Sequence, residues 1–216
     1  LFVCNLLYSQ GKPEHLFYYI DNEESFASFR ANIDKISIVA PRAFSVDEDG
    51  IVWGAVDGRV IEIAREHAVG VMPYINNPGF DQQMLHRLLV NPEARARCIA
   101  TLVALCAQHK FLGIQFDFEN LHVNDKKVFT TFYQETAEAL QKQGFKLSVA
   151  VVHRPEEYAG PTAYHKWLFE NWRAGYDLEA LAKAGDFISV MTYSQHTRRT
   201  TPGSNAGIPW VTLVIE

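Results

Sequence analysis

The sequence contains few cysteines and no long apolar segment. Its 216 residues include three cysteines, Cys4, Cys98 and Cys106, and an odd number leaves no complete disulfide framework. Cys98 and Cys106 lie in one expected helix, about 12 Å apart along its axis, which is too far for a disulfide. We therefore expect small buried side chains rather than cross-links. No stretch approaches the roughly 20 apolar residues of a membrane helix, so no membrane span is expected.

Positive charge is also scarce. The net charge is −5 and there is no long basic segment, so neither nucleic acid nor an anionic membrane is expected as a partner. The hydrophobic share of 48% and charged share of 21% are typical of globular proteins. We interpret residues 1–216 as a single domain, with residues 1–14 as an N-terminal extension. Leu1–Tyr8 are apolar but short, and a secretory signal stays an open alternative.

Short apolar segments alternate with longer amphipathic ones along the chain. The apolar segments are typical of strands buried on both faces, and this alternation predicts βαβ units with a parallel sheet. A small hairpin is expected over Val46–Gly54, and an irregular loop over Arg154–Trp172. The six expected strands are His15–Ile20, Lys35–Ala40, Gly70–Ile75, Gly113–Glu119, Lys146–Val152 and Asp186–Tyr193.

Two α/β architectures fit this alternation, a doubly wound sheet and a (β/α)8 TIM barrel. No Gly-x-Gly-x-x-Gly segment follows the first strand, which weakens the dinucleotide-binding version of the doubly wound sheet. A complete barrel has eight units and about 250 residues, whereas no seventh strand is evident before Glu216. We predict a TIM barrel truncated after about six βα units, whose uncovered edge strands would favour association.

Two carboxylates end the fourth expected strand. Asp117 and Glu119 flank Phe118, and side chains two residues apart on a strand point to the same face. Active sites of TIM barrels form at the carboxyl ends of the strands. Adjacent negative charges raise one of the two pKa values, which keeps that group protonated near neutral pH, as a general acid requires. Because burying unpaired charge is costly, a catalytic role is favoured over a plain strand end.

Polar and aromatic side chains also lie in or after other strands. Tyr193 ends the sixth strand and could donate a hydrogen bond into the site. Asn76 follows the third strand and could contact a sugar, although asparagine there is also common turn chemistry. Tyr18 in the first strand offers a ring that could stack on a sugar.

Motifs on the fourth and sixth strands together resemble a known family. Phe116–Glu119 (Phe-Asp-Phe-Glu) resembles the end of the Asp-x-x-Asp-x-Asp-x-Glu signature of glycoside hydrolase family 18, the chitinase-like enzymes. Met191–Tyr193 (Met-Thr-Tyr) resembles the Met-x-Tyr-Asp strand of that family. The likeness covers most of the chain and is closest to the bacterial YaaH-like group of spore-germination and cortex-lytic N-acetylglucosaminidases.

The resemblance implies hydrolysis of β-linked N-acetylglucosamine in peptidoglycan or chitin-type glycans, with net retention. Glu119 would protonate the glycosidic oxygen while the 2-acetamido oxygen of the substrate attacks the anomeric carbon, an exception to the two-carboxylate scheme. Asp117 would orient the acetamido group and stabilise its positive charge, and Tyr193 would hydrogen-bond the same group. The expected substrate-binding residues are Gln115, Met191, Asn76, Tyr18 and Gln195.

Three positions depart from the family signature. Leu112 and Gln115 stand where its first two acids would be, and a neutral amide at the Gln115 position is usual in the YaaH-like group. Ser194 replaces the Asp of Met-x-Tyr-Asp, which removes a carboxylate that helps to hold the acetamido group or Glu119. The resemblance implies no cofactor and no metal, and favours an extracellular or cell-envelope location.

Two other interpretations stay open. A chitinase-like carbohydrate-binding protein would keep the groove without turnover, which Ser194 and the missing strands favour and the retained Glu119 disfavours. An unrelated (β/α) enzyme would use both carboxylates on a sugar without a 2-acetamido group. Activity on such a sugar would separate this second alternative from the family 18 mechanism.

Overall fold

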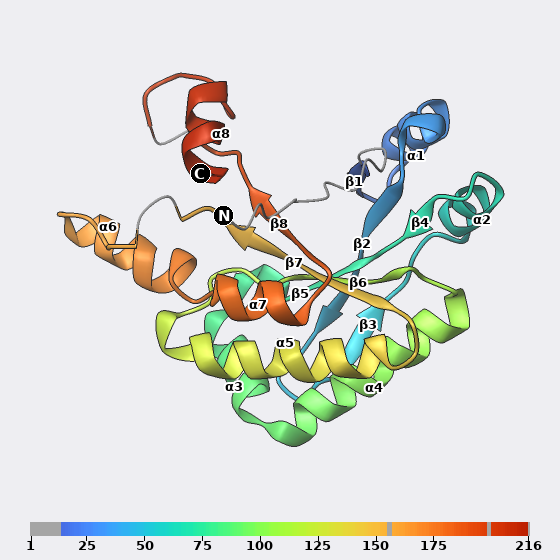
Figure 1. The fold of residues 1–216 in the computed structure, drawn as a ribbon, viewed down its shortest axis with the longest axis horizontal. Coiled ribbons are helices and arrows are strands. Elements are labelled where there is room, and N and C mark those ends of the chain that lie inside the picture. The colour runs from blue at the N-terminus through green and yellow to red at the C-terminus, as the bar shows by residue number, and fades with distance from the viewer. Residues whose placement is uncertain (1–13, 155–156, 198–199, 216) are drawn as a thin grey trace, which may run out of the picture.

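The computed structural model describes residues 14–154, 157–197 and 200–215, so Cys4 and nearly all of the expected N-terminal extension lie outside the described residues. Its centre is a curled sheet of parallel strands (Figure 1). The strand order confirms consecutive βα units and the α/β fold class. In order across the sheet, the strands are β1 (Leu16–Tyr19), β2 (Ile38–Val46), β5 (Tyr74–Asn76), β6 (Gly113–Asp117), β7 (Lys146–Val152) and β8 (Phe187–Met191).

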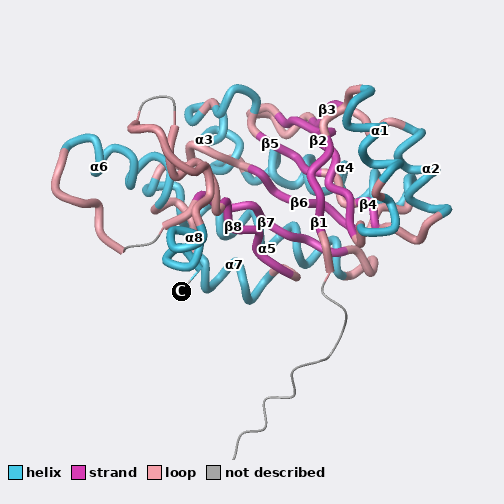
Figure 2. The backbone as a smooth tube through the Cα atoms, turned by 90° about the horizontal axis from the view of Figure 1, so that it is seen from above, coloured by secondary structure: helices cyan, strands magenta, loops and turns pink. Residues whose placement is uncertain are grey.

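Two short strands extend β2. β3 (Val52–Gly54) pairs with it antiparallel and forms the expected hairpin, and β4 (Gly70–Val71) pairs with it parallel. Figure 2 shows the helices around the strands, with α1 and α2 beyond one end of the sheet and α6 and α8 beyond the other. The α-helices are α1 (Glu23–Ala31), α2 (Gly58–Glu66), α3 (Gln82–Val90), α4 (Pro92–His109), α5 (Lys126–Gln141), α6 (Ala163–Leu168), α7 (Leu178–Ala184) and α8 (Ile208–Ile215). The shorter helical turns are η1 (Ile33–Lys35), η2 (Pro78–Phe80), η3 (Val123–Asp125) and η4 (Phe169–Arg173).

An aromatic cluster joins β6 to α5 at the centre of the core. Phe116 lies against Phe118 and Phe132, with ring centroids 5.0 and 5.1 Å apart, and Phe129 and Tyr133 complete the cluster. All five side chains are fully buried, and burying each stabilises the fold by about 2–3 kcal/mol. Because Phe116 points to the helices, its neighbours on the strand point to the opposite, inner face of the sheet.

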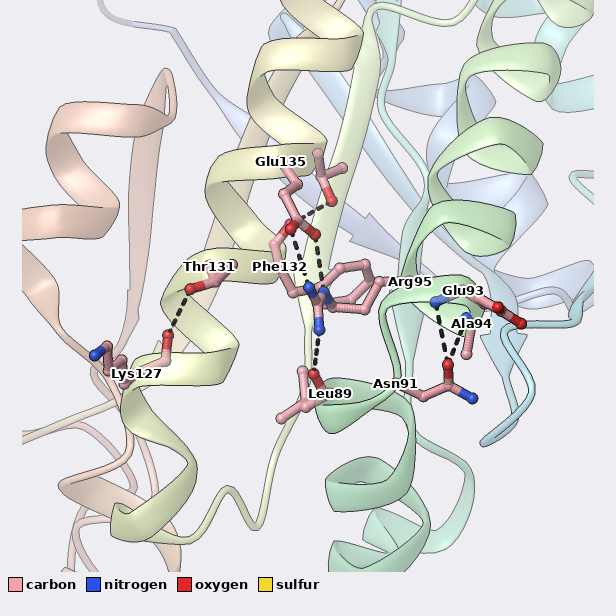
Figure 3. Close-up of polar contacts among 10 residues, drawn as sticks. Leu89, Asn91, Glu93, Ala94, Arg95, Lys127, Thr131, Phe132 and Glu135 are labelled. Atoms are coloured by element: carbon pink, nitrogen blue, oxygen red, sulfur yellow. Dashed lines mark hydrogen bonds and ion pairs between the residues drawn. The ribbon is translucent and has the colours of Figure 1, made fainter.

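A partly buried ion pair ties α4 to α5 (Figure 3). The Arg95 guanidinium donates to both carboxylate oxygens of Glu135, at 2.8 and 3.0 Å, and to the Leu89 carbonyl at 2.6 Å. Asn91 caps the start of α4, because its Oδ1 accepts the N–H groups of Glu93 and the following residue. Asn91 as the cap and Pro92 at the first helical position therefore set the start of α4.

Several strand boundaries differ from the sequence prediction. The expected third strand is interrupted between β4 and β5 at Pro73, which has no N–H to donate to a neighbouring strand. β2 continues to Val46, beyond the expected end at Ala40, because β3 and β5 pair with its second half. β6 ends at Asp117, so Glu119 lies in the turn that follows the strand rather than on it.

The prediction of an irregular loop over Arg154–Trp172 was wrong. It contains α6, capped by the Thr162 hydroxyl that accepts the His165 N–H, followed by the π-helical turn η4. The Thr162 cap was the sequence signal for this helix. α8 was also absent from the prediction.

Cys98 and Cys106 are buried and free, as expected from their helical spacing. No helix within residues 14–154, 157–197 and 200–215 is both long and apolar enough to cross a membrane.

Candidate active site

The inner face of the sheet carries a continuous row of polar side chains. In the strand register, Tyr74 of β5 lies beside Gln115 of β6, and Gln115 lies beside Ser148 of β7. One step nearer the carboxyl ends, Asn76 lies beside Asp117. Register in a parallel sheet puts paired side chains on the same face, so these residues from three strands share one surface.

Gln115 organises this surface. Its side chain is completely buried, and its amide donates to the hydroxyl oxygens of Ser148 at 3.1 Å and Ser189 at 3.2 Å. These bonds link β6, β7 and β8. The Gln115 Oε1 atom is buried without a hydrogen-bond partner among the described residues.

Asp117 and Glu119 form an electrostatically coupled pair. Burial raises the pKa of Asp117 to about 6, although the positive charge of Arg42 acts in the opposite direction. Burial, and secondly the negative charge of Asp117, raises the pKa of Glu119 to about 7. Glu119 therefore holds its proton close to neutral pH, while Asp117 loses its proton first. The sequence argument relied on the neighbouring charge, whereas burial is the larger cause of both raised pKa values. The roles of the two carboxyl groups toward a substrate stay predictions.

Hydrogen bonds from side chains to the backbone fix the turn that presents Glu119. The Asn77 side chain donates to the Glu119 carbonyl at 2.9 Å and accepts the Glu119 N–H at 3.0 Å. One residue earlier, the buried Tyr176 hydroxyl donates to the Phe118 carbonyl at 2.7 Å. Asn77 is 1% exposed, so both of its bonds are shielded from water. Asn77, just after β5, and Tyr176, shortly after η4, therefore hold this turn in place.

Three tyrosines surround the carboxylates. The rings of Tyr18 and Tyr74 meet edge to face, with centroids 5.8 Å apart. Burial raises the pKa of each to about 12, with Asp117 adding to the increase; contacts with Ser189 and Gln115 partly offset it for Tyr18. Burial, then the charges of the two carboxylates, raises the pKa of the half-exposed Tyr193. All three hydroxyls therefore stay protonated and can donate hydrogen bonds at neutral pH.

The other expected substrate-binding residues have different surroundings. Asn76 is 6% exposed, and its Oδ1 accepts the Ser45 hydroxyl at 3.0 Å. The Met191 carbonyl faces His153 Nδ1 at 3.2 Å. The Gln195 Oε1 accepts the Gly207 N–H just before α8, at 2.8 Å. These contacts orient the side chains of Asn76 and Gln195 and the backbone of Met191. The roles of the three residues in binding a sugar stay predictions.

The sequence did not identify Arg42 and Tyr74 as site residues. Arg42 falls two residues beyond the expected end of its strand, and Tyr74 lay inside a strand that was expected to be uniformly apolar. The sequence does not show which residues of neighbouring strands pair, and this pairing is what places Tyr74 beside Gln115, and Arg42 beside Tyr74, on the inner face. No cluster of three or more His, Cys, Asp or Glu side chains suited to a metal ion occurs in the part of the chain that the structure describes.

Comparison with known proteins identifies the family. Residues 17–210 match the model of "Glycosyl hydrolases family 18". The chain belongs to this family. It is 25% identical over 199 residues to the "Uncharacterized glycosylase YvbX" of Bacillus subtilis (strain 168), covering 90% of this chain and 55% of YvbX. It is 26% identical over 147 residues to the "Cortical fragment-lytic enzyme" of the same organism, covering 68% of this chain and 32% of that protein.

Solved structures show the same fold. A chitinase from Chromobacterium violaceum ATCC 12472 has a TM-score of 0.81 at 24% identity, over 93% of this chain and 62% of that one. The Bacillus cereus spore cortex-lytic enzyme SleL has a TM-score of 0.83 at 19% identity, over 94% of this chain and 46% of that one. The chain spans 55% and 32% of the lengths of the two curated relatives, and it has the fold of this portion of a family 18 barrel.

Proposed function

We propose that the protein hydrolyses β-linked N-acetylglucosamine glycans with Glu119 as the general acid. The carboxylate pair at the end of β6 is the observation that carries the proposal. A pKa of about 7 for Glu119, beside a more acidic Asp117, suits proton donation to a leaving oxygen near neutral pH. Membership of family 18 supports the same reaction class.

In the proposed reaction the substrate supplies its own nucleophile. Glu119 donates its proton to the glycosidic oxygen as the bond to the anomeric carbon breaks, and the 2-acetamido oxygen forms a new bond to that carbon. The Asp117 carboxylate stabilises the positive charge on the resulting oxazolinium ring. The Tyr193 hydroxyl donates a hydrogen bond to the acetamido group. Ionised Glu119 then takes a proton from water, which opens the ring with net retention.

Gln115 has a supporting role in this proposal. Its amide is held by two serine hydroxyls, and it lies on the same face as Asp117, two residues away. A neutral amide here adds no third negative charge, so the pKa of Asp117 stays low enough for ionisation at neutral pH. The substrate class is peptidoglycan or chitin-type glycan, which agrees with the cortical and chitinase names of relatives.

Chromophore release from an aryl N-acetyl-β-glucosaminide and an aryl chitobioside tests the proposal. We expect turnover by the wild type and a loss of at least about a hundredfold in Glu119→Gln, because general acid catalysis contributes about that much or more. Glu62→Gln, an exposed change on α2, is the matched control. An aryl β-glucoside that lacks the acetamido group should not be cleaved, and its cleavage would contradict the substrate-assisted route.

A carbohydrate-binding protein without turnover is the second candidate. Ser194 favours it, because it stands where the family has an Asp, and its N–H is bound to Asn205 Oδ1 at 3.0 Å in a left-handed turn with φ of 65°. Binding of a chitooligosaccharide by the wild type, with no release of chromophore from either aryl substrate, would favour this candidate.

A further inference from the structure

An arginine lies on the inner face of the sheet two strands away from β6, the strand that ends at Asp117. Arg42 is on β2, in register with Tyr74 of β5, and is exposed. Tyr74 is in turn in register with Gln115. Arg42 therefore continues the polar row of the inner face one strand further from β6. The register shifts between Arg42 and Phe44, and such an irregularity redirects side chains at the rim of a barrel.

The charge of Arg42 reaches the site, although its guanidinium is unpaired. It acts on Asp117 and on the Tyr74 hydroxyl, where it partly offsets the rise in pKa that burial causes in each. Within the described residues it makes no hydrogen bond and no ion pair. All five N–H donors are thus available to a ligand, in a planar fork that matches a carboxylate.

A neutral glycan has no group that matches this fork. N-acetylglucosamine offers hydroxyl and amide groups, which tyrosine, glutamine and asparagine side chains can already bind. Arginine and a carboxylate form two parallel charge-assisted hydrogen bonds. Arg42 acts on the pKa of Asp117, and Asp117 acts on that of Glu119. Among the described residues, Arg42 is thus the cation whose charge reaches Asp117 and can offset a further negative charge brought by the substrate.

We propose that Arg42 binds the carboxylate of an acidic sugar that adjoins N-acetylglucosamine in the substrate, and so selects carboxylated glycans over neutral ones. The chemistry fits a sugar that carries a lactyl ether, as in muramyl residues. This inference rests on the proposed function and narrows its substrate class. Arg42 is a specificity-determining residue in this account, and Glu119 remains the acid.

Binding measured in the Glu119→Gln background tests the inference without turnover. The probes are tetra-N-acetylchitotetraose, a tetrasaccharide of alternating N-acetylglucosamine and N-acetylmuramic acid, and the methyl ester of that tetrasaccharide. We expect Arg42→Gln to lower the ratio of affinities, free acid over ester, by about tenfold, as loss of one charge-assisted pair predicts. Arg42→Lys should restore part of the ratio, because it keeps the charge and loses the fork.

The control is Arg87→Gln, an exposed arginine on α3 that pairs with Glu48. It should leave the ratio unchanged. An unchanged ratio in Arg42→Gln would overturn the inference, as would an equal preference of the parent protein for acid and ester. Absence of binding to all three probes, with no chromophore release by the wild type, would instead reject the proposed function. A peptide carboxylate as the true ligand would appear as tighter binding only when a stem peptide is attached, which also overturns the proposal.

Discussion

Replacing Glu119 with glutamine should stabilise the folded protein at pH 8 and leave its stability unchanged at pH 4. The pKa of this carboxyl is raised from 4.5 to about 7, first by burial and then by the charge of Asp117. The unfolded chain therefore loses the proton before the folded protein does as the pH rises. Ionised Glu119 thus costs stability, and the cost develops between about pH 4.5 and pH 7 and persists above it.

The structure sets the size of the effect. One tenfold change in a proton dissociation constant corresponds to about 1.4 kcal/mol, so a pKa of about 7 in place of 4.5 corresponds to about 3 kcal/mol. Glu119 is partly in contact with solvent, which screens the interaction with Asp117 and reduces the expected gain to about 2 kcal/mol. Glutamine preserves the shape of the side chain, and the Asn77 bonds involve only the Glu119 backbone.

Urea denaturation followed by circular dichroism at pH 4 and pH 8 measures both values of the unfolding free energy. Glu62→Gln on the exposed face of α2 is the control and should change little at either pH. A gain for Glu119→Gln that is equal at the two pH values would refute the reasoning, because it would not depend on ionisation. A loss of stability at pH 8 would show that the carboxylate is stabilised by a contact with the charged form.

Three further substitutions test the surroundings of the site and the core. Asn77→Ala removes both bonds to the Glu119 backbone and should lower the unfolding free energy by about 2 kcal/mol and reduce kcat more than KM, as steady-state kinetics would show. Tyr176→Phe leaves a buried carbonyl without its 2.7 Å donor and should cost about 1–3 kcal/mol in urea denaturation. Arg95→Met breaks the ion pair with Glu135 and should lower the unfolding free energy by about 1–3 kcal/mol. A double-mutant cycle with Glu135→Gln measures the coupling energy between the two side chains, and additive losses would contradict a stabilising pair.

Much of the fold follows from local sequence patterns. The starts of the helices after Asp57, Asp81 and Asn91 are set locally, because each of these side chains caps the first turn of its own helix. Strand ends were predicted less well because they depend on partners elsewhere in the chain. The interruption at Pro73 and the early end of β6 both reflect which cross-strand hydrogen bonds form.

In the candidate site, too, some residues could be predicted from local sequence, whereas others are brought there by tertiary contacts. Asp117 and Glu119 could be identified from the sequence, because both lie in one short segment at the carboxyl end of an apolar strand. Arg42 comes from a distant strand, and Tyr176 holds the turn from a segment that was expected to follow an irregular loop. Only the register of the sheet and the tertiary contacts bring such residues together.

The stereochemistry of the first product tests the central claim most directly. Real-time proton NMR during hydrolysis of a chitooligosaccharide distinguishes the two anomers of the newly formed reducing end before they interconvert. The account predicts that the β-anomer appears first, because the acetamido group and then water attack the anomeric carbon from opposite sides in turn. First appearance of the α-anomer would mean direct attack by water, and would contradict the roles proposed for Asp117 and Glu119.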